Sequence, residues 1–295
     1  MLTKNEFIVL SNIATSVCPL TQRMLKDLTG LSLGTVNKTV LNLERSNYIK
    51  DGQVTETGMQ ILQNYKVKRA VFLAAGFGSR LVPITLNTPK PMIRVNGKRI
   101  IDGLIDACLN VGIDEIYVVR GYLSSEFNQL LSKYPMIKFI ENTIYNESNN
   151  ISSAMAARQY LSNAYILESD LVINNPSVIT PYQYCSNFLG FKTDRTDDWC
   201  FKTKNGKIIS QEIGGVDCYQ EYGISYWNDS DGKQLKIDLE QAFSQPGGKE
   251  LFWDRVPFEK FSKHYSVSIR ECKINDLTEI DTFNELKIID KSYDI

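Results

Sequence analysis

Hydrophobic residues in the first 66 positions recur at intervals of three and four, a spacing that predicts short helices. The expected helices cover 5–14, then 22–28 between a Thr21 cap and Gly30, then a segment that Ser32 can cap and that carries Leu33, Val36, Val40 and Leu43 on one face. Asp51-Gly52 between two short extended pieces predicts a hairpin. Residues 1–66 therefore form one candidate domain.

From Lys68 onward the pattern changes to apolar runs that alternate with helical periodicity. Strands are expected at 70–75, 115–120, 137–141 and 165–168, and helices at 100–111, 124–134 and 151–161. This alternation predicts an α/β domain over residues 67–295, Rossmann-like, with a mostly parallel sheet and helices on both faces. Ligands of such sheets bind beyond the carboxyl ends of the strands. After Pro176 we expect shorter strands, a hairpin at Asn205-Gly206, and a subdomain that binds the acceptor.

Composition narrows the function classes. The 295 residues carry a net charge of −1, so no field of the whole chain favours nucleic acid or an anionic membrane. No apolar run approaches the roughly 20 residues of a membrane helix. The six cysteines are scattered, and His264 is the one histidine, which argues against zinc and against histidine-activated nucleophiles. We expect a cytoplasmic protein with reduced thiols, and His264 in a structural role.

Three helices followed by a hairpin resemble a winged helix-turn-helix module of the MarR-like type. In one interpretation Thr35, Asn37, Lys38 and Asn42 enter a DNA groove. In the other, the module serves docking or dimerisation, and a homodimer stays open. Residues 1–66 hold seven Lys or Arg against five Asp or Glu, and this small excess favours the second interpretation. We expect at most weak, salt-sensitive DNA binding.

The segment "FLAAGFGSRLVPITLNTPKPM", residues 72–92, joins the first strand of the α/β domain to a helix. It lacks the Gly-Lys-Ser/Thr of a P-loop, and it has two of the three glycines of the dinucleotide fingerprint. Arg80 and Lys90 lie beside backbone N–H groups that glycines leave exposed. Two cations with such N–H groups suit a triphosphate.

This segment resembles the Gly-x-Gly-x-Arg and Pro-Lys signature of the sugar-nucleotidyltransferase-like family. A closer likeness is to the bacterial choline-phosphate cytidylyltransferases, through "NTPK", "SSA", "TDDW", "ELFWD" and "EID" within residues 70–283. The resemblance implies an enzyme that transfers CMP from CTP to phosphocholine and releases pyrophosphate. A phosphate acceptor is already ionised at pH 7, so no general base is required.

The resemblance also implies roles for single residues. Arg80 would hold the β- and γ-phosphates, and Lys90 would neutralise the α-phosphate. The nucleotide would otherwise contact Leu73, Ala74, Ala75, Gly76, Gly78, Ser79, Gly121, Tyr122, Asn149 and Asn150. Asp170 and Asp281 would hold Mg²⁺, which prefers oxygen ligands. Glu168 stands where the family commonly has the first aspartate of Asp-x-Asp, so its role stays open.

For the acceptor, the resemblance implies that Trp199 and Trp253 present ring faces to a trimethylammonium group, with Asp198 and Asp254 beside them. Phosphoethanolamine or 2-aminoethylphosphonate would use the same carboxylates and fewer ring faces, so these acceptors stay open, as does a sugar 1-phosphate. The non-enzyme alternative is a transcriptional regulator that senses a nucleotide. Retention of Arg80, Lys90, Asp170 and Asp281 favours the enzyme.

Overall fold

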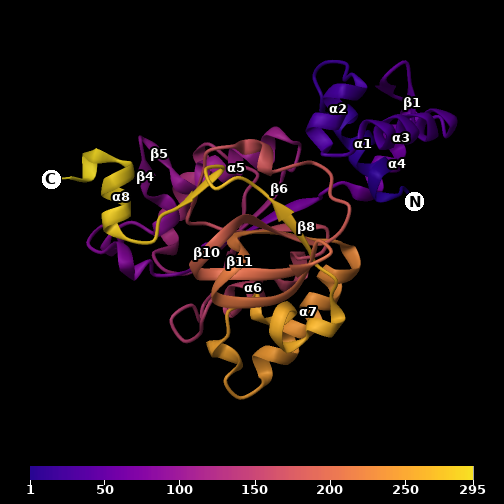
Figure 1. Cartoon of the computed structure of the whole chain (residues 1–295). Helices are drawn as coiled ribbons and strands as arrows, with labels where there is room; N and C mark the ends of the chain where they lie inside the picture. The colour runs from indigo at the N-terminus through magenta and orange to yellow at the C-terminus, as the bar shows by residue number, and fades with distance from the viewer. Residues whose placement is uncertain (295) are drawn as a thin grey trace. The chain divides into compact units, whose positions relative to one another are not determined.

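The computed structural model describes residues 1–294, which form two compact units (Figure 1). One unit consists of residues 1–66 with 182–184, and the other contains the rest of the described chain. The division falls near residue 67, where the spacing of hydrophobic positions changes.

The smaller unit contains the three predicted helices and the predicted hairpin. These are α1 (Lys4–Thr15), α2 (Gln22–Thr29), α3 (Leu33–Arg45), and the antiparallel strands β1 (Ile49–Lys50) and β2 (Gln53–Val54). Thr21 and Ser32 cap α2 and α3 as expected. A fourth helix, α4 (Glu56–Leu62), was not expected, since Gly58 weakens helical propensity. A Cβ at Gly58 would lie 2.1 Å from the Tyr48 carbonyl oxygen, so close packing requires glycine there.

The larger unit is built on a seven-stranded sheet of order β10-β12-β11-β8-β3-β6-β7. Its parallel centre consists of β3 (Arg69–Leu73), β6 (Glu115–Arg120), β7 (Lys138–Glu141) and β8 (Ala164–Glu168). The predicted α/β class with a mostly parallel central sheet is therefore confirmed. β3 and β8 are neighbours in the sheet. Their carboxyl ends are at Leu73 and Glu168, which pair with each other.

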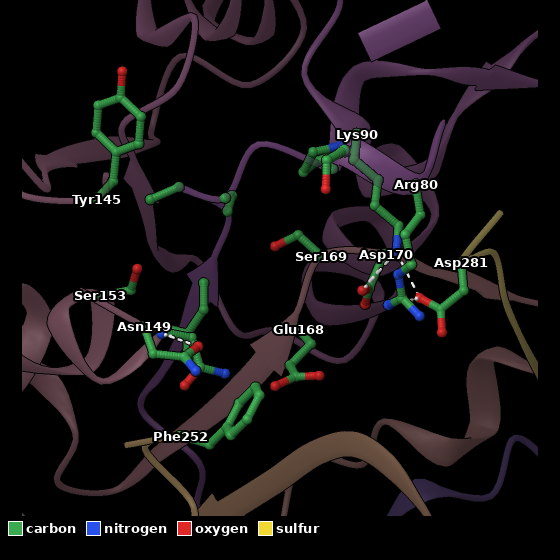
Figure 2. Close-up of a pocket in the computed structure, with 18 of the residues that line it drawn as sticks. Arg80, Lys90, Tyr145, Asn149, Ser153, Glu168, Ser169, Asp170, Phe252 and Asp281 are labelled. Atoms are coloured by element: carbon green, nitrogen blue, oxygen red, sulfur yellow. Dashed lines mark hydrogen bonds and ion pairs between the residues drawn. The ribbon is translucent and has the colours of Figure 1, made fainter. Parts of the chain in front are cut away.

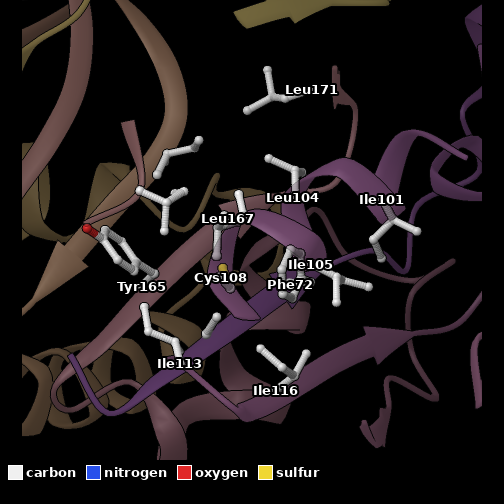
Figure 3. Close-up of a cluster of buried hydrophobic side chains, with 14 of the residues drawn as sticks. Phe72, Ile101, Leu104, Ile105, Cys108, Ile113, Ile116, Tyr165, Leu167 and Leu171 are labelled. Atoms are coloured by element: carbon white, nitrogen blue, oxygen red, sulfur yellow. The ribbon is translucent and has the colours of Figure 1, made fainter. Parts of the chain in front are cut away.

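Side chains of the central strands alternate between two hydrophobic cores. On one face, Phe72 and Leu167 pack with Leu104 and Cys108 of α5 (Ile100–Asn110) (Figure 3). On the other face, Ile166 belongs to a cluster that includes residues of α6 (Ile151–Ala157) and α7 (Asp229–Ser244). The period of two fixes which face each residue covers, and helices cover both faces as predicted.

The second half of this unit differs from the expectation of shorter strands. β10 (Asn187–Lys204) and β11 (Lys207–Trp227) form one long antiparallel hairpin with several bulges. Its turn is at Asn205-Gly206 as predicted, and both residues have positive φ, 53° and 72°. The bulges curl the hairpin, so that Cys200 pairs with both Glu212 and Gln220.

The remaining elements are shorter. They are β4 (Arg94–Val95), β5 (Lys98–Arg99), β9 (Leu171–Ile173), β12 (Ser268–Glu271), β13 (Leu277–Glu279) and α8 (Phe283–Ile289). The segment expected as a helix at 124–134 is a 3₁₀ helix over Ser124–Ser132. Within residues 1–294, no helix has the length and apolar character needed to cross a bilayer. All six cysteines are free thiols.

Candidate active site

The loop after β3 is held by close packing at Gly78 and by a hydrogen bond from the Thr85 side chain. Gly78 has φ of 62°, and a Cβ there would lie 3.0 Å from Cβ of Lys90, so glycine permits the close approach of two parts of the loop. The Thr85 hydroxyl donates to the Gly78 carbonyl at 3.0 Å. The loop therefore folds back on itself and brings Lys90 close to the glycines.

A small hydrophobic cluster fixes this loop against the C-terminal segment. Its buried members are Leu81, Ile93, Val95, Ile100, Ile280 and Leu286. Because Leu81 and Ile280 belong to one cluster, their neighbours Arg80 and Asp281 are held near each other. This packing explains why residues about 200 positions apart meet in one site.

Lys90 and Arg80 form ion pairs with the two predicted metal ligands (Figure 2). Nζ of Lys90 donates to Asp170 at 2.9 Å and to Asp281 at 3.1 Å. The Arg80 guanidinium donates to the same Asp281 oxygen at 2.7 Å. Burial by itself lowers the pKa of Lys90, but Asp170 and Asp281 outweigh it and raise that pKa. Lys90 is thus firmly cationic.

A third carboxylate, Glu279, completes this group, and the sequence analysis missed it. One oxygen each from Asp170, Glu279 and Asp281 lie within 4.8 Å of one another. Burial, followed by repulsion from Asp170 and Asp281, raises the pKa of Glu279 to about 8. Oδ1 of Asp170 is buried and has no hydrogen-bond partner among residues 1–294. An unpartnered oxygen in a set of hard oxygen donors fits a divalent cation such as Mg²⁺.

These residues open onto one cavity of about 690 Å³. Of the residues predicted to contact the nucleotide, Leu73, Ala74, Ala75, Gly76, Gly78, Ser79, Asn149 and Asn150 line it. Gly121 and Tyr122 do not line it. The Tyr122 hydroxyl instead donates to the Thr85 carbonyl at 2.8 Å, and the ring packs on Phe77. The expectation that Gly121 and Tyr122 line the nucleotide pocket is therefore wrong. Tyr122 instead stabilises the loop after β3 through its contacts with Thr85 and Phe77.

Polar residues that the sequence analysis did not select complete this side of the cavity. They are Asn142, Tyr145, Ser148, Ser152 and Ser153. The Asn142 amide donates to the hydroxyls of Ser152 and Ser153 at 2.9 and 3.1 Å. The quoted stretch "SSA" held the signal for the two serines. Asn142 carried no local signal, because its position depends on the pairing of β6 with β7.

Three further carboxylates form a group in the wall of the cavity. Glu168, Glu221 and Asp254 all line it, from β8, from β11 and from the segment after α7. Burial, with repulsion from Asp170 and then Asp254, raises the pKa of Glu168. Burial and then Asp254 raise the pKa of Glu221, and burial raises the pKa of Asp254. No lysine or arginine within residues 1–294 forms an ion pair with these three side chains.

Gly223 makes room for Glu168. A Cβ at position 223 would lie 2.6 Å from the Glu168 carboxylate. Gly223 lies on β11, which pairs with β8. The Glu168 side chain, whose role the sequence left open, therefore occupies a space that the neighbouring strand keeps free. Among the described residues it accepts no hydrogen bond, so its oxygens are available to a ligand.

Of the two tryptophans predicted to bind the acceptor, only Trp199 lines the cavity, with Asp198 beside it. The prediction for Trp253 is wrong. Trp253 is 1% exposed and packs between Phe188 and Trp227, with ring centroids 6.1 Å away in each case. Its neighbour Phe252 lines the cavity instead and meets Trp199 edge to face at 5.6 Å.

His264 is outside this site. Its Nδ1 lies 2.9 Å from an Asp238 oxygen on α7, and it does not line the cavity. The expectation of a structural histidine agrees with this position.

A parallel sheet with a glycine loop, a buried lysine and a group of carboxylates is the arrangement that the sequence led us to expect of a nucleotidyltransferase. Comparison with known proteins agrees: residues 69–186 match the family model described as nucleotidyl transferase. The 2-aminoethylphosphonate cytidylyltransferase of Lancefieldella rimae is 37% identical over 234 residues, covering 78% of this chain and 95% of that protein. The chain belongs to the nucleotidyl transferase family and is an enzyme of that class.

Two further relatives are also cytidylyltransferases. The choline-phosphate cytidylyltransferase of Haemophilus influenzae is 28% identical over 219 residues, covering 73% of this chain and 93% of that protein. The solved CTP:phosphocholine cytidylyltransferase of Streptococcus pneumoniae superimposes with a TM-score of 0.71 at 25% identity. The superposition covers 77% of this chain and 99% of the Streptococcus pneumoniae chain. Cytidylyl transfer is the activity that these relatives support.

Proposed function

We propose that this enzyme transfers CMP from CTP to a small phosphonate or phosphate that carries a primary ammonium group. 2-Aminoethylphosphonate and phosphoethanolamine are the acceptors of this class. The observation that carries the proposal is the group of three carboxylates, Glu168, Glu221 and Asp254, in the lining of the cavity. The relative that acts on 2-aminoethylphosphonate, at 37% identity, supports the same choice.

In the proposed reaction, an acceptor oxygen attacks the α-phosphorus of CTP. The bond from that phosphorus to the oxygen that bridges the α- and β-phosphates breaks, and pyrophosphate leaves with that oxygen. Lys90 balances charge at the α-phosphate, while Ser79, Gly78 and Arg80 bind the β- and γ-phosphates. Phosphoryl chemistry of this kind depends mainly on positioning and charge neutralisation. The attacking oxygen is ionised at neutral pH, so no side chain has to remove a proton.

Asp170, Asp281 and Glu279 would hold Mg²⁺ in this reaction. When bound, the ion would neutralise negative charge on the α-phosphate and fix its orientation. In the free enzyme Lys90 and Arg80 pair with Asp170 and Asp281. Binding of the nucleotide would turn both cations from the carboxylates to the phosphates, so the same residues serve both states.

The acceptor end favours a primary over a quaternary ammonium. A primary ammonium has three N–H donors, and carboxylates accept hydrogen bonds in return. A trimethylammonium group has none and depends on ring faces. Trp253, one of the two rings expected there, is buried in the core, and the Arg255 guanidinium already lies 5.8 Å over the Trp199 ring. Phosphocholine is the second candidate, which the Trp199–Phe252 pair favours.

The test is release of pyrophosphate from CTP with a panel of acceptors. We expect kcat/KM for 2-aminoethylphosphonate or phosphoethanolamine to exceed that for phosphocholine by at least tenfold. Ethylphosphonate, which lacks the amine, should be a poor acceptor. A preference for phosphocholine, or equal use of ethylphosphonate, would reject the primary ammonium. Absence of pyrophosphate release with every acceptor would reject the function.

A further inference from the structure

We infer that Gln211 is a positioning residue that keeps the acceptor end of the cavity selective for an amine, an inference that rests on the proposed function. Gln211 lies on β11, the strand that also carries Glu221. It is not among the residues that line the cavity, and its amide lies behind two of the carboxylates that do. No motif in the sequence marks it.

The Gln211 amide joins Glu221 to Asp254. Its Nε2 donates to Oε2 of Glu221 at 2.8 Å and to Oδ2 of Asp254 at 2.5 Å. The amide nitrogen can only donate hydrogen bonds, and both partners offer carboxyl oxygens that accept them, so the nitrogen faces both. Both N–H bonds of the amide are thereby used.

These two hydrogen bonds hold together groups that repel each other. Glu221 and Asp254 come from distant parts of the chain. Burial raises the pKa of both carboxyl groups. A charge-assisted hydrogen bond is stronger than one between neutral groups. Without the amide, the two carboxylates would rotate apart or take up a proton, and the arrangement facing the cavity would be lost.

The neutrality of Gln211 is the feature that serves selectivity. A lysine or arginine at this position would hold the same carboxylates but cancel their charge. An amide holds them without adding a positive charge that would repel a ligand ammonium. Oδ1 of Asp254 accepts the backbone N–H of Arg255 at 3.1 Å, so Glu221 and Glu168 retain the oxygens available to a substrate ammonium.

Gln211→Met tests this role, because methionine has a similar length and no donor. Steady-state kinetics would be measured with 2-aminoethylphosphonate, ethylphosphonate and CTP. We expect KM for 2-aminoethylphosphonate to rise about 10- to 100-fold, consistent with the loss of hydrogen bonds to charged groups. KM for CTP and kcat/KM for ethylphosphonate should stay within about twofold of the wild type. Gln211→Asn, which keeps a shorter amide, should show a smaller rise in the same KM.

Glu212→Gln is the matched control, because Glu212 is exposed on the same strand and does not line the cavity. It should leave all three parameters unchanged. An unchanged KM for 2-aminoethylphosphonate in folded Gln211→Met and Gln211→Asn would overturn the inference. So would an equal loss with the amine and with ethylphosphonate, which indicates a purely structural role. Failure of the wild type to use any amine acceptor would instead reject the proposed function.

Discussion

Replacement of Lys90 by methionine tests the cluster of cations and carboxylates most severely. Lys90 is 8% exposed and forms ion pairs with both Asp170 and Asp281. Methionine keeps the apolar stem and removes the charge. The variant therefore leaves two carboxylates facing each other, with Arg80 as the remaining partner of Asp281 and no ion pair left for Asp170 within residues 1–294.

The effect on turnover and the effect on stability have separate causes. Loss of one group that stabilises transition-state charge typically costs about 10²- to 10³-fold in kcat. Hydrogen bonds to charged groups contribute about 1.5–3 kcal/mol each. Part of this lost stability is offset, because the wild type has to desolvate the lysine charge and the methionine variant does not. We therefore expect the free energy of unfolding to fall by about 2 kcal/mol. For a domain of this size that corresponds to a Tm lower by about 4–8 °C.

Kinetics at saturating CTP, together with thermal unfolding, measure both effects. Mg²⁺ alone should raise the Tm of Lys90→Met more than that of the wild type, since a cation would then replace the missing lysine between Asp170 and Asp281. Lys233→Met is the control: Lys233 pairs with Asp229 at 2.6 Å but is 69% exposed. That variant should change neither kcat nor Tm appreciably. A kcat for Lys90→Met within threefold of the wild type would refute the assignment of Lys90.

The other predictions concern the metal ligands, the Trp199 ring, the dependence of stability on pH, and DNA binding. Asp170→Asn and Asp281→Asn should each abolish turnover with the fold intact by circular dichroism, and near-normal kcat at saturating Mg²⁺ would contradict their role. Trp199→Leu should lower kcat/KM for phosphocholine about 2- to 30-fold and that for 2-aminoethylphosphonate less; equal losses would show that its ring does not discriminate. Because the pKa of Glu279 is raised to about 8, the native metal-free state binds more protons than the unfolded state, so the free energy of unfolding should fall as pH rises from about 4.5 to 8. Glu279→Gln should flatten that dependence in denaturant titrations, and an unchanged slope would disprove the shift. The full chain should bind DNA weakly and lose that binding with salt; nanomolar affinity at 150 mM salt would favour the regulator interpretation.

Local patterns in the sequence predicted the central sheet well, because those strands are short and their period is regular. Phe72 and Leu167 face one core and Ile166 the other, as period two requires. The hairpin of β10 and β11 was predicted poorly. Its bulges change which face each residue occupies, so alternation within "TDDW" did not indicate one long strand.

The part of the site from Leu73 to Lys90 could be predicted because it lies in one contiguous loop. The region proposed for the acceptor could be predicted only in part. Asp198, Trp199 and Asp254 line the cavity as expected, but Glu221 was missed because the region is assembled from strands paired far along the chain. In "ELFWD", the sequence does not show which aromatic residue faces the core. The structure buries Trp253 and leaves Phe252 38% exposed. The position of the Glu168 side chain requires the space at Gly223, and Glu221 accepts a hydrogen bond from Gln211. Local spacing in the sequence does not reveal either contact.

The central claim is transfer of CMP to an amine-bearing acceptor, and a competition experiment tests it most directly. The enzyme would receive limiting CTP with Mg²⁺ and equal concentrations of 2-aminoethylphosphonate, phosphoethanolamine and phosphocholine. The nucleotide products would be identified by mass spectrometry. The account predicts that CMP conjugates of the two primary amines, together with pyrophosphate, make up most of the product. Predominant CDP-choline, or hydrolysis of CTP without a conjugate, would contradict it.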